Sequence, residues 1–129
     1  MNRNYQWIAA ILGLVFSLGI GGCGSPSPAA ASDPNLARTT LEKVLDSWKK
    51  GEASTALAKD SPIIFISDED WEAGARLKSY KIESEGELVG TSLRAPVTLK
   101  IQDPKGRPQT RKVFFTVTTQ PVLRVDRQD

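Results

Sequence analysis

Residues 92–102 alternate strictly between apolar and polar side chains, and this pattern limits the fold more than any other part of the chain. The apolar members are Leu93, Ala95, Val97, Leu99 and Ile101. A period of two places them on one face of a β-strand and the polar residues on the other. A strand of this kind needs neighbouring strands and a cover for its apolar face. We therefore expect an antiparallel sheet with one buried face and one face in water.

Shorter segments on both sides extend the predicted sheet to about four antiparallel strands. Tyr80 and Ile82 alternate with polar residues before a glycine-marked loop at 86–90, and Val113, Phe115 and Val117 alternate after it. The residues DPKGRP favour a turn between the two central strands, and VLRVDR ends the chain as a last strand. Pro96, inside a regular strand, predicts an edge or a bulge.

Helices are expected before the sheet. Asp33 and Pro34 suit a helix start, an apolar stripe follows, and Gly51 suits its end. The stripe consists of Leu41, Val44, Leu45 and Trp48. We also predict a short helix over 52–59 that buries Ala56 and Leu57, and a strand-like segment in PIIFIS. The fold class is therefore α+β, with N-terminal helices packed on one face of the sheet.

Four acidic residues in SDEDWEAG form the most concentrated charge cluster. They are Asp68, Glu69, Asp70 and Glu72. A calcium loop of the EF-hand type needs glycine at its sixth position and glutamate at its twelfth, where this chain has Ala73 and Ser79. We instead expect Ser67 to cap a short helix, with Asp70 completing a capping box and Gly74 ending the helix. We expect no metal here.

Residues 33–129 are enough for one domain with one core. Without Arg3, the chain carries 16 basic and 15 acidic residues, a balance that argues against nucleic-acid binding. The charge is unevenly distributed. Residues 33–90 have 12 acidic and 8 basic side chains, whereas residues 91–129 have 3 acidic and 8 basic side chains.

Residues 1–22 have the three parts of an export signal. Arg3 supplies positive charge, residues 7–20 are an apolar run, and two small residues follow. As a helix, the run would be about 21 Å long, which is short of the ~30 Å hydrocarbon core of a bilayer. A cleaved signal peptide is therefore a better interpretation than a spanning helix.

Cys23, the only cysteine, directly follows Ile20, Gly21 and Gly22. This sequence resembles the lipobox of bacterial lipoproteins. The resemblance implies acylation of Cys23 with palmitate-type chains, cleavage before it, and a domain held on a membrane outside the cytoplasm. The alternatives are an ordinary signal with a stray cysteine or an uncleaved short anchor. The covalent lipid on Cys23 is the only prosthetic group expected.

Residues 23–32 then form the lipidated cysteine and a tether of glycine, serine, proline and alanine. Proline-rich spacers favour extended conformations, so this tether could hold the domain ~28 Å from the bilayer. In the lipoprotein family, aspartate after the cysteine usually marks inner-membrane retention. Gly24 occupies that position, so retention is not indicated.

The segments LEKVLDSWKKGEASTAL, DEDWEAGARLKSYKI and VFFTVTTQPVLRVDR together resemble nuclear transport factor 2-like domains. The resemblance covers nearly all of residues 33–129 and rests mostly on core-packing residues. It implies a curved, cone-like sheet that wraps a long helix. This fold carries enzymes, ligand binders and interaction modules, so it does not by itself decide the function.

The chain offers little for catalysis. It has no histidine and no recognisable nucleophile or phosphate-binding motif, which leaves Asp68 or Asp70 as a carboxylate base for an isomerase-type or cyclase-type reaction. We therefore expect a non-enzymatic protein.

Two binding hypotheses remain. In one, the cone holds a small apolar ligand lined by residues among Trp48, Trp71, Tyr80 and Phe115. In the other, these aromatics fill the core, and the polar face with Arg94, Thr98 and Lys100 docks an envelope protein, a second copy of the chain, or an anionic polymer or head group. We favour the interaction surface, because so small a domain has little core to give up.

Overall fold

The structure is a computed structural model that describes residues 30–129. The predicted export signal and Cys23 lie outside the described residues, as does most of the predicted tether. The elements, in chain order, are α1 (Pro34–Lys49), the 3₁₀ helix η1 (Ala56–Lys59), β1 (Ile64–Ser67), α2 (Glu69–Glu72), β2 (Arg76–Ile82), β3 (Glu87–Val89), β4 (Ser92–Gln102), β5 (Pro108–Thr118) and β6 (Leu123–Gln128).

Helix α1 begins and ends where the sequence predicts. The Asp33 side chain accepts hydrogen bonds from the backbone N–H groups of Asn35 and Leu36, at 2.8 and 3.2 Å. Gly51 follows the helix with a φ of +85°, a conformation that glycine adopts without strain. The predicted stripe is buried throughout, so α1 turns one continuous apolar face to the sheet.

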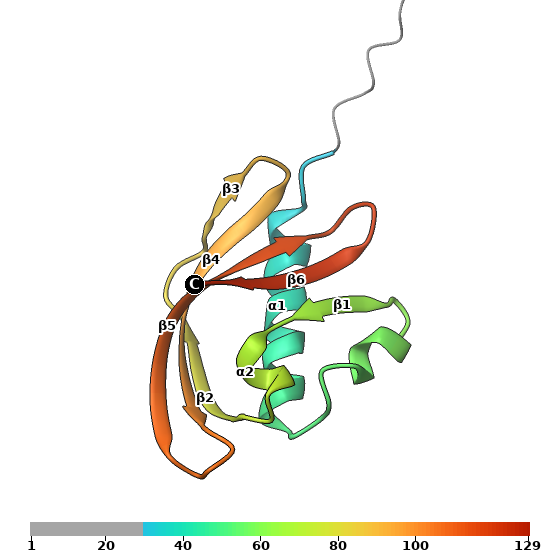
Figure 1. Cartoon of the computed structure of the whole chain (residues 1–129). Coiled ribbons are helices and arrows are strands. Elements are labelled where there is room, and N and C mark those ends of the chain that lie inside the picture. Colours follow the sequence, from blue (N-terminus) through green and yellow to red (C-terminus); the bar gives the residue numbers. More distant parts are fainter. Residues whose placement is uncertain (1–29) are drawn as a thin grey trace, which may run out of the picture.

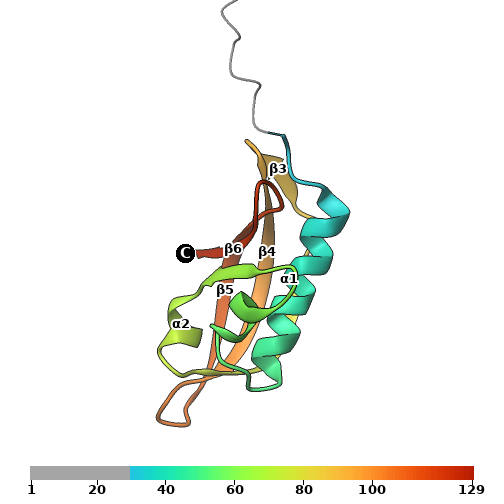
Figure 2. The ribbon, with the colours of Figure 1, turned by 90° about the vertical axis from the view of Figure 1, so that its right-hand side faces the viewer.

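The sheet is mixed and has six strands rather than the expected four or so. Its order is β1-β6-β5-β4-β2, and β3 also pairs with β4. β1 runs parallel to β6, while the other pairs are antiparallel. The additional strand β3 occupies the predicted glycine loop. Figures 1 and 2 show the sheet curling around α1, which gives the cone-like α+β shape.

The prediction of several covering helices is wrong in detail. Only α1 is long, and residues 52–59 contain just the four-residue η1, in which Leu57 is buried and Ala56 is half-buried. Asp68, and not Ser67, caps α2. The physical reason is that Ser67 still pairs with Asp126 in the β1–β6 ladder, so Asp68 is the first residue free to cap.

The core lies between α1 and the concave face of the sheet. All five apolar residues of the alternating segment in β4 are buried, as are Val113, Phe115 and Val117 in β5. The predicted phase of both strands is therefore confirmed.

Pro96 lies in the interior strand β4, at a break in its pairing. β2 pairs with Val97 and the residues after it, whereas β3 pairs with Arg94 and the residues before it. The Pro96 carbonyl still accepts a hydrogen bond from the Glu83 N–H at 2.9 Å. The missing proline N–H cannot return a bond to Glu83, so pairing with β2 stops here.

Candidate functional site

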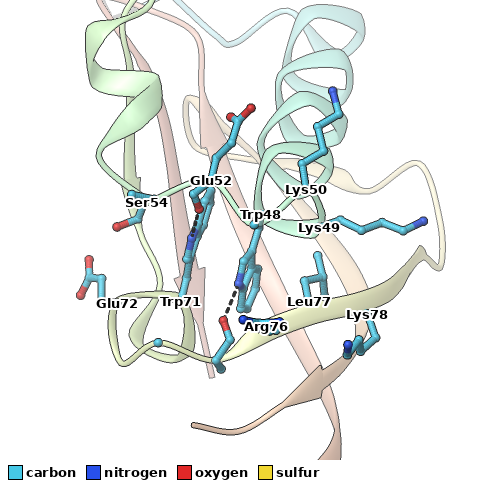
Figure 3. Close-up of a pocket in the computed structure, with 14 residues that line it drawn as sticks. Trp48, Lys49, Lys50, Glu52, Ser54, Trp71, Glu72, Arg76, Leu77 and Lys78 are labelled. Atoms are coloured by element: carbon cyan, nitrogen blue, oxygen red, sulfur yellow. Dashed lines mark hydrogen bonds between the residues drawn. The ribbon is translucent and has the colours of Figure 1, made fainter. Parts of the chain in front are cut away.

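The two predicted pocket tryptophans form a stacked pair. Trp48, from the last turn of α1, and Trp71, from α2, have ring centroids 5.3 Å apart and planes inclined by 7°. The Trp48 indole N–H donates to the Ala75 carbonyl at 2.9 Å, and the Trp71 indole N–H donates to the Glu52 carbonyl at 3.0 Å (Figure 3). Both polar ends are therefore satisfied inside the domain.

This pair lines a half-open depression of about 750 Å³ at the C-terminal end of α1. The charged side chains around it are Lys49, Lys50, Glu52, Glu72, Arg76 and Lys78. In Figure 3, Lys49 and Lys50 extend away from the tryptophans. Trp48 and Trp71 are only 2% and 6% exposed, so they offer a ligand almost no aromatic surface. Charged side chains therefore surround the depression, and the buried tryptophans form its base.

The other two predicted lining residues lie elsewhere. Phe115 is 1% exposed in the core, and Tyr80 donates its hydroxyl hydrogen to Asp46 Oδ1 at 2.7 Å. Burial, together with this bond and the negative charge of Asp46, raises the pKa of Tyr80 above its ordinary value. Neither residue lines the depression beside the tryptophans. Of the four residues predicted to line one pocket, only Trp48 and Trp71 border this depression. Phe115 lies in the core, and Tyr80 is half-buried beside Asp46.

The outer face of the sheet brings Arg94, Thr98 and Lys100 together, as the alternation predicts. Arg94 and Thr98 are half-buried and Lys100 is exposed. The Arg94 guanidinium carbon lies 3.8 Å from the centroid of the Phe114 ring. Phe114, which pairs with Pro96 on the neighbouring strand, remains 37% exposed. A cation over an aromatic ring therefore sits on two interior strands of the sheet.

A shallow groove of about 440 Å³ lies beside this aromatic ring. Its polar residues are Glu83, Thr98 and Lys112, and Pro96 and Phe114 supply apolar surface. The Thr98 hydroxyl donates to Glu83 Oε1 at 2.8 Å, which fixes one wall of the groove.

Sequence reasoning missed Phe114, Lys112 and Glu83 as members of this face. One signal was present for Phe114. Two consecutive phenylalanines in a strand must point to opposite faces, so if Phe115 is in the core, Phe114 is outside.

The acidic cluster lies at the start of α2, as predicted, but its cap is Asp68, and Asp70 pairs with Arg127 instead of completing a capping box with Ser67. Asp68 Oδ1 accepts the backbone N–H groups of Asp70 and Trp71 at 2.9 and 3.1 Å and lies 3.3 Å from Arg127 Nη1. Arg127 also pairs with Asp70 and Asp129, and Arg111 lies 3.6 Å from Asp70. Ion pairs therefore engage both candidate bases.

Asp68 is the most buried member of this cluster. Its Oδ2 atom is buried and has no hydrogen-bond partner within the described residues. Burial raises the pKa of the Asp68 carboxyl above its usual value, although the Trp71 N–H and Arg127 act in the opposite direction.

Comparison with known protein families, characterised proteins and solved structures finds no match for the chain. Within residues 30–129, no helix is long and apolar enough to cross a membrane. The same residues contain no group of three or more acidic, histidine or cysteine side chains arranged to hold a metal ion.

Proposed function

We propose that this chain is a bacterial lipoprotein of the cell envelope, anchored in a membrane through acyl chains on Cys23. The complete export signal and the lipobox-like residues before Cys23 support this proposal. The domain at 33–129 then lies outside the cytoplasm. Its single long helix within a curled sheet supports a relationship to nuclear transport factor 2-like domains.

We further propose that the domain is a non-enzymatic interaction module that docks a protein through the outer face of its sheet. The observation that carries this proposal is Arg94 stacked on the exposed ring of Phe114. Arginine and aromatic residues dominate the energetic centres of protein interfaces, especially beside pockets that exclude water. The adjacent groove offers such a pocket for one side chain of a partner.

The chemistry of this face favours a partner with acidic groups around an apolar residue. Lys100 and Lys112 lie on the face and are in none of the ion pairs formed by the described residues, so both are available to a partner. A second copy of the chain would have to present acidic groups to this basic face. We therefore favour a different envelope protein.

The packing of the core supports the interaction hypothesis over a small apolar ligand inside the cone. Phe115 and Trp48 fill the space between helix and sheet with 1% and 2% exposure. Arg127 also pairs with both Asp68 and Asp70, and Asp68 is only 2% exposed, so neither carboxylate is free to face a substrate.

The anchor is tested by metabolic labelling with a palmitate analogue. The wild-type chain should be labelled and should fractionate with membranes, whereas Cys23→Ala should lose both properties. Label that persists in Cys23→Ala, or none in the wild type, rejects the lipid assignment.

The docking face is tested by placing a photo-crosslinking residue at Lys112 in cells. The wild-type background should give a discrete cross-linked band, and Arg94→Glu with Lys100→Glu should weaken it. The matched control is Lys59→Glu with Lys105→Glu, which makes the same change in net charge at exposed positions away from this face. Equal bands in both variants, or no band at all, would count against this face.

A further inference from the structure

The end of the tether is fastened to the domain at Ser32, which is 2% exposed. The Ser32 N–H and hydroxyl both donate to the Thr91 carbonyl, at 2.8 and 2.6 Å. Its hydroxyl oxygen also accepts the Thr119 N–H at 2.9 Å, and the Asp33 N–H donates to the Thr119 hydroxyl at 3.1 Å. The chain therefore enters the domain at a fixed place, between the β3–β4 turn and the segment joining β5 to β6.

Four large apolar side chains are exposed on the segments that meet at Ser32. They are Leu36, Leu88, Val89 and Val122, with exposures of 45, 48, 53 and 45%. Leu36 lies in the first turn of α1, Leu88 and Val89 lie in β3, and Val122 lies just before β6. Figures 1 and 2 both place these segments at the end of the domain where the tether arrives. We call these four residues the tether-end patch.

The length of the tether keeps this patch close to the proposed anchor. Nine residues separate Cys23 from the first helical cap, Asp33, and span ~28 Å in the extended conformation typical of proline-rich spacers. A flexible chain of nine residues has an average end-to-end distance of only ~17 Å. The turn between β4 and β5 lies at the opposite end of the domain (Figures 1 and 2), so the patch is the part nearest the acyl chains.

We propose that the tether-end patch rests on the surface of the bilayer that holds Cys23, so that the domain stands with the start of α1 toward the lipid. This inference depends on the lipid anchor proposed above. Four aliphatic side chains would bind a membrane only weakly by themselves. The anchor makes their contact intramolecular, with an effective concentration in the millimolar range for short linkers, so weak contacts are sufficient.

The single cysteine of the chain makes a direct test available. Acylation uses the Cys23 thiol, so a cysteine introduced elsewhere is the only one left for labelling. Full-length Val89→Cys and Val122→Cys would be lipidated in cells, labelled with a fluorophore and reconstituted into phosphatidylcholine vesicles that contain a nitroxide-bearing lipid. Lys105→Cys, exposed in the β4–β5 turn, is the control at the far end.

The expected result is severalfold stronger quenching at positions 89 and 122 than at 105. Adding Leu88→Ser and Val89→Ser to the Val122→Cys protein should reduce its quenching, while flotation with the vesicles is unchanged because the acyl chains remain. Equal quenching at all three positions in vesicle-bound protein overturns the proposal.

Two other results have distinct meanings. Protein that carries no acyl chain and does not float with vesicles rejects the anchor, and this inference with it. Label at position 89 that is shielded equally in detergent micelles, together with a dimer on cross-linking, shows that a second copy covers the patch and also overturns the membrane contact.

Discussion

Trp48 and Trp71 stack with nearly parallel rings, and this contact joins the last turn of α1 to α2. Their indole N–H groups donate in different directions, one to Ala75 and the other to Glu52. The pair thus connects α1 and α2 to each other, to the segment that follows α1 and to the segment that follows α2. In Figure 1, the last turn of α1 lies at the end of the domain opposite to the start of the helix, so the pair packs at that end of α1.

We predict that Trp71→Ala lowers the free energy of unfolding by about 3–5 kcal/mol, because it removes a large buried ring. Trp71→Phe keeps an aromatic ring and loses mainly the hydrogen bond to Glu52, so it should cost about 1–2 kcal/mol. Urea denaturation followed by circular dichroism measures both values. Equal losses in the two variants would show that the ring stack contributes little.

A second prediction concerns the tight approach of Gly86 to β4. A Cβ atom at Gly86 would lie 2.5 Å from the Arg94 carbonyl oxygen, whereas at Gly90 it would meet nothing within 4 Å. Both glycines have positive φ, at +80° and +62°, so alanine is strained at either position. Gly90→Ala should therefore cost about 1 kcal/mol, and Gly86→Ala clearly more.

The comparison of the two glycine variants isolates the steric term, since the backbone strain is similar in both. Thermal unfolding of the two proteins beside the wild type is sufficient. Gly86→Ala should also weaken cross-linking from Lys112, because the backbone that must move carries Arg94. A Gly86→Ala protein as stable as Gly90→Ala would contradict the close approach.

A third prediction compares two arginines of β6. Arg127 has a side chain only 8% exposed between Asp68 and Asp70, whereas Arg124 pairs with Asp126 at a site where its side chain is 55% exposed. Arg127→Met leaves buried carboxylates without their cation and should cost about 3–5 kcal/mol. Arg124→Met removes a surface pair and should cost less than ~1 kcal/mol.

Chemical denaturation at neutral pH measures this difference. Arg127→Lys is a useful third protein, because it keeps the charge and loses the planar guanidinium that reaches several carboxylates at once. It should fall between the wild type and Arg127→Met. Similar losses for Arg124→Met and Arg127→Met would contradict the structural role assigned to Arg127.

Periodicity and capping were enough to predict the local structure of α1, β4 and β5. The strand phase of β4 and β5 and the start and end of α1 follow from neighbours within a few positions, so the sequence displays them directly. The same reasoning placed Arg94, Thr98 and Lys100 on one face. Strand β3 was missed because all three of its residues are exposed and carry no alternation.

The remaining features depend on contacts between distant residues, which no local pattern encodes. β1 pairs with β6 across 59 positions, and Arg127 reaches Asp68 across the same separation. Arg94 meets Phe114 only because β4 and β5 pair in one register. The lipid on Cys23 stays a prediction from sequence, since Cys23 lies outside the described residues.

A final prediction follows from the burial of Asp68. Its pKa is raised in the folded state above the ordinary value of 3.8, so the folded protein holds this proton more tightly than the unfolded chain does. The stability that this proton contributes is fully present below pH 3.8 and is lost as the pH rises through the folded-state pKa. Asp68→Asn removes this titration and keeps an oxygen that can cap α2.

The measurement is urea denaturation of wild type and Asp68→Asn between pH 3.5 and neutral pH. The wild type should gain stability relative to Asp68→Asn as the pH falls toward 3.8, because only the wild type takes up the proton on Asp68, while contributions common to both proteins largely cancel in the difference. Lysine and arginine remain charged throughout this range, so the sign of the slope reports on Asp68. A difference that stays constant with pH, or that favours Asp68→Asn in acid, would show that Arg127 holds Asp68 ionised in spite of its burial.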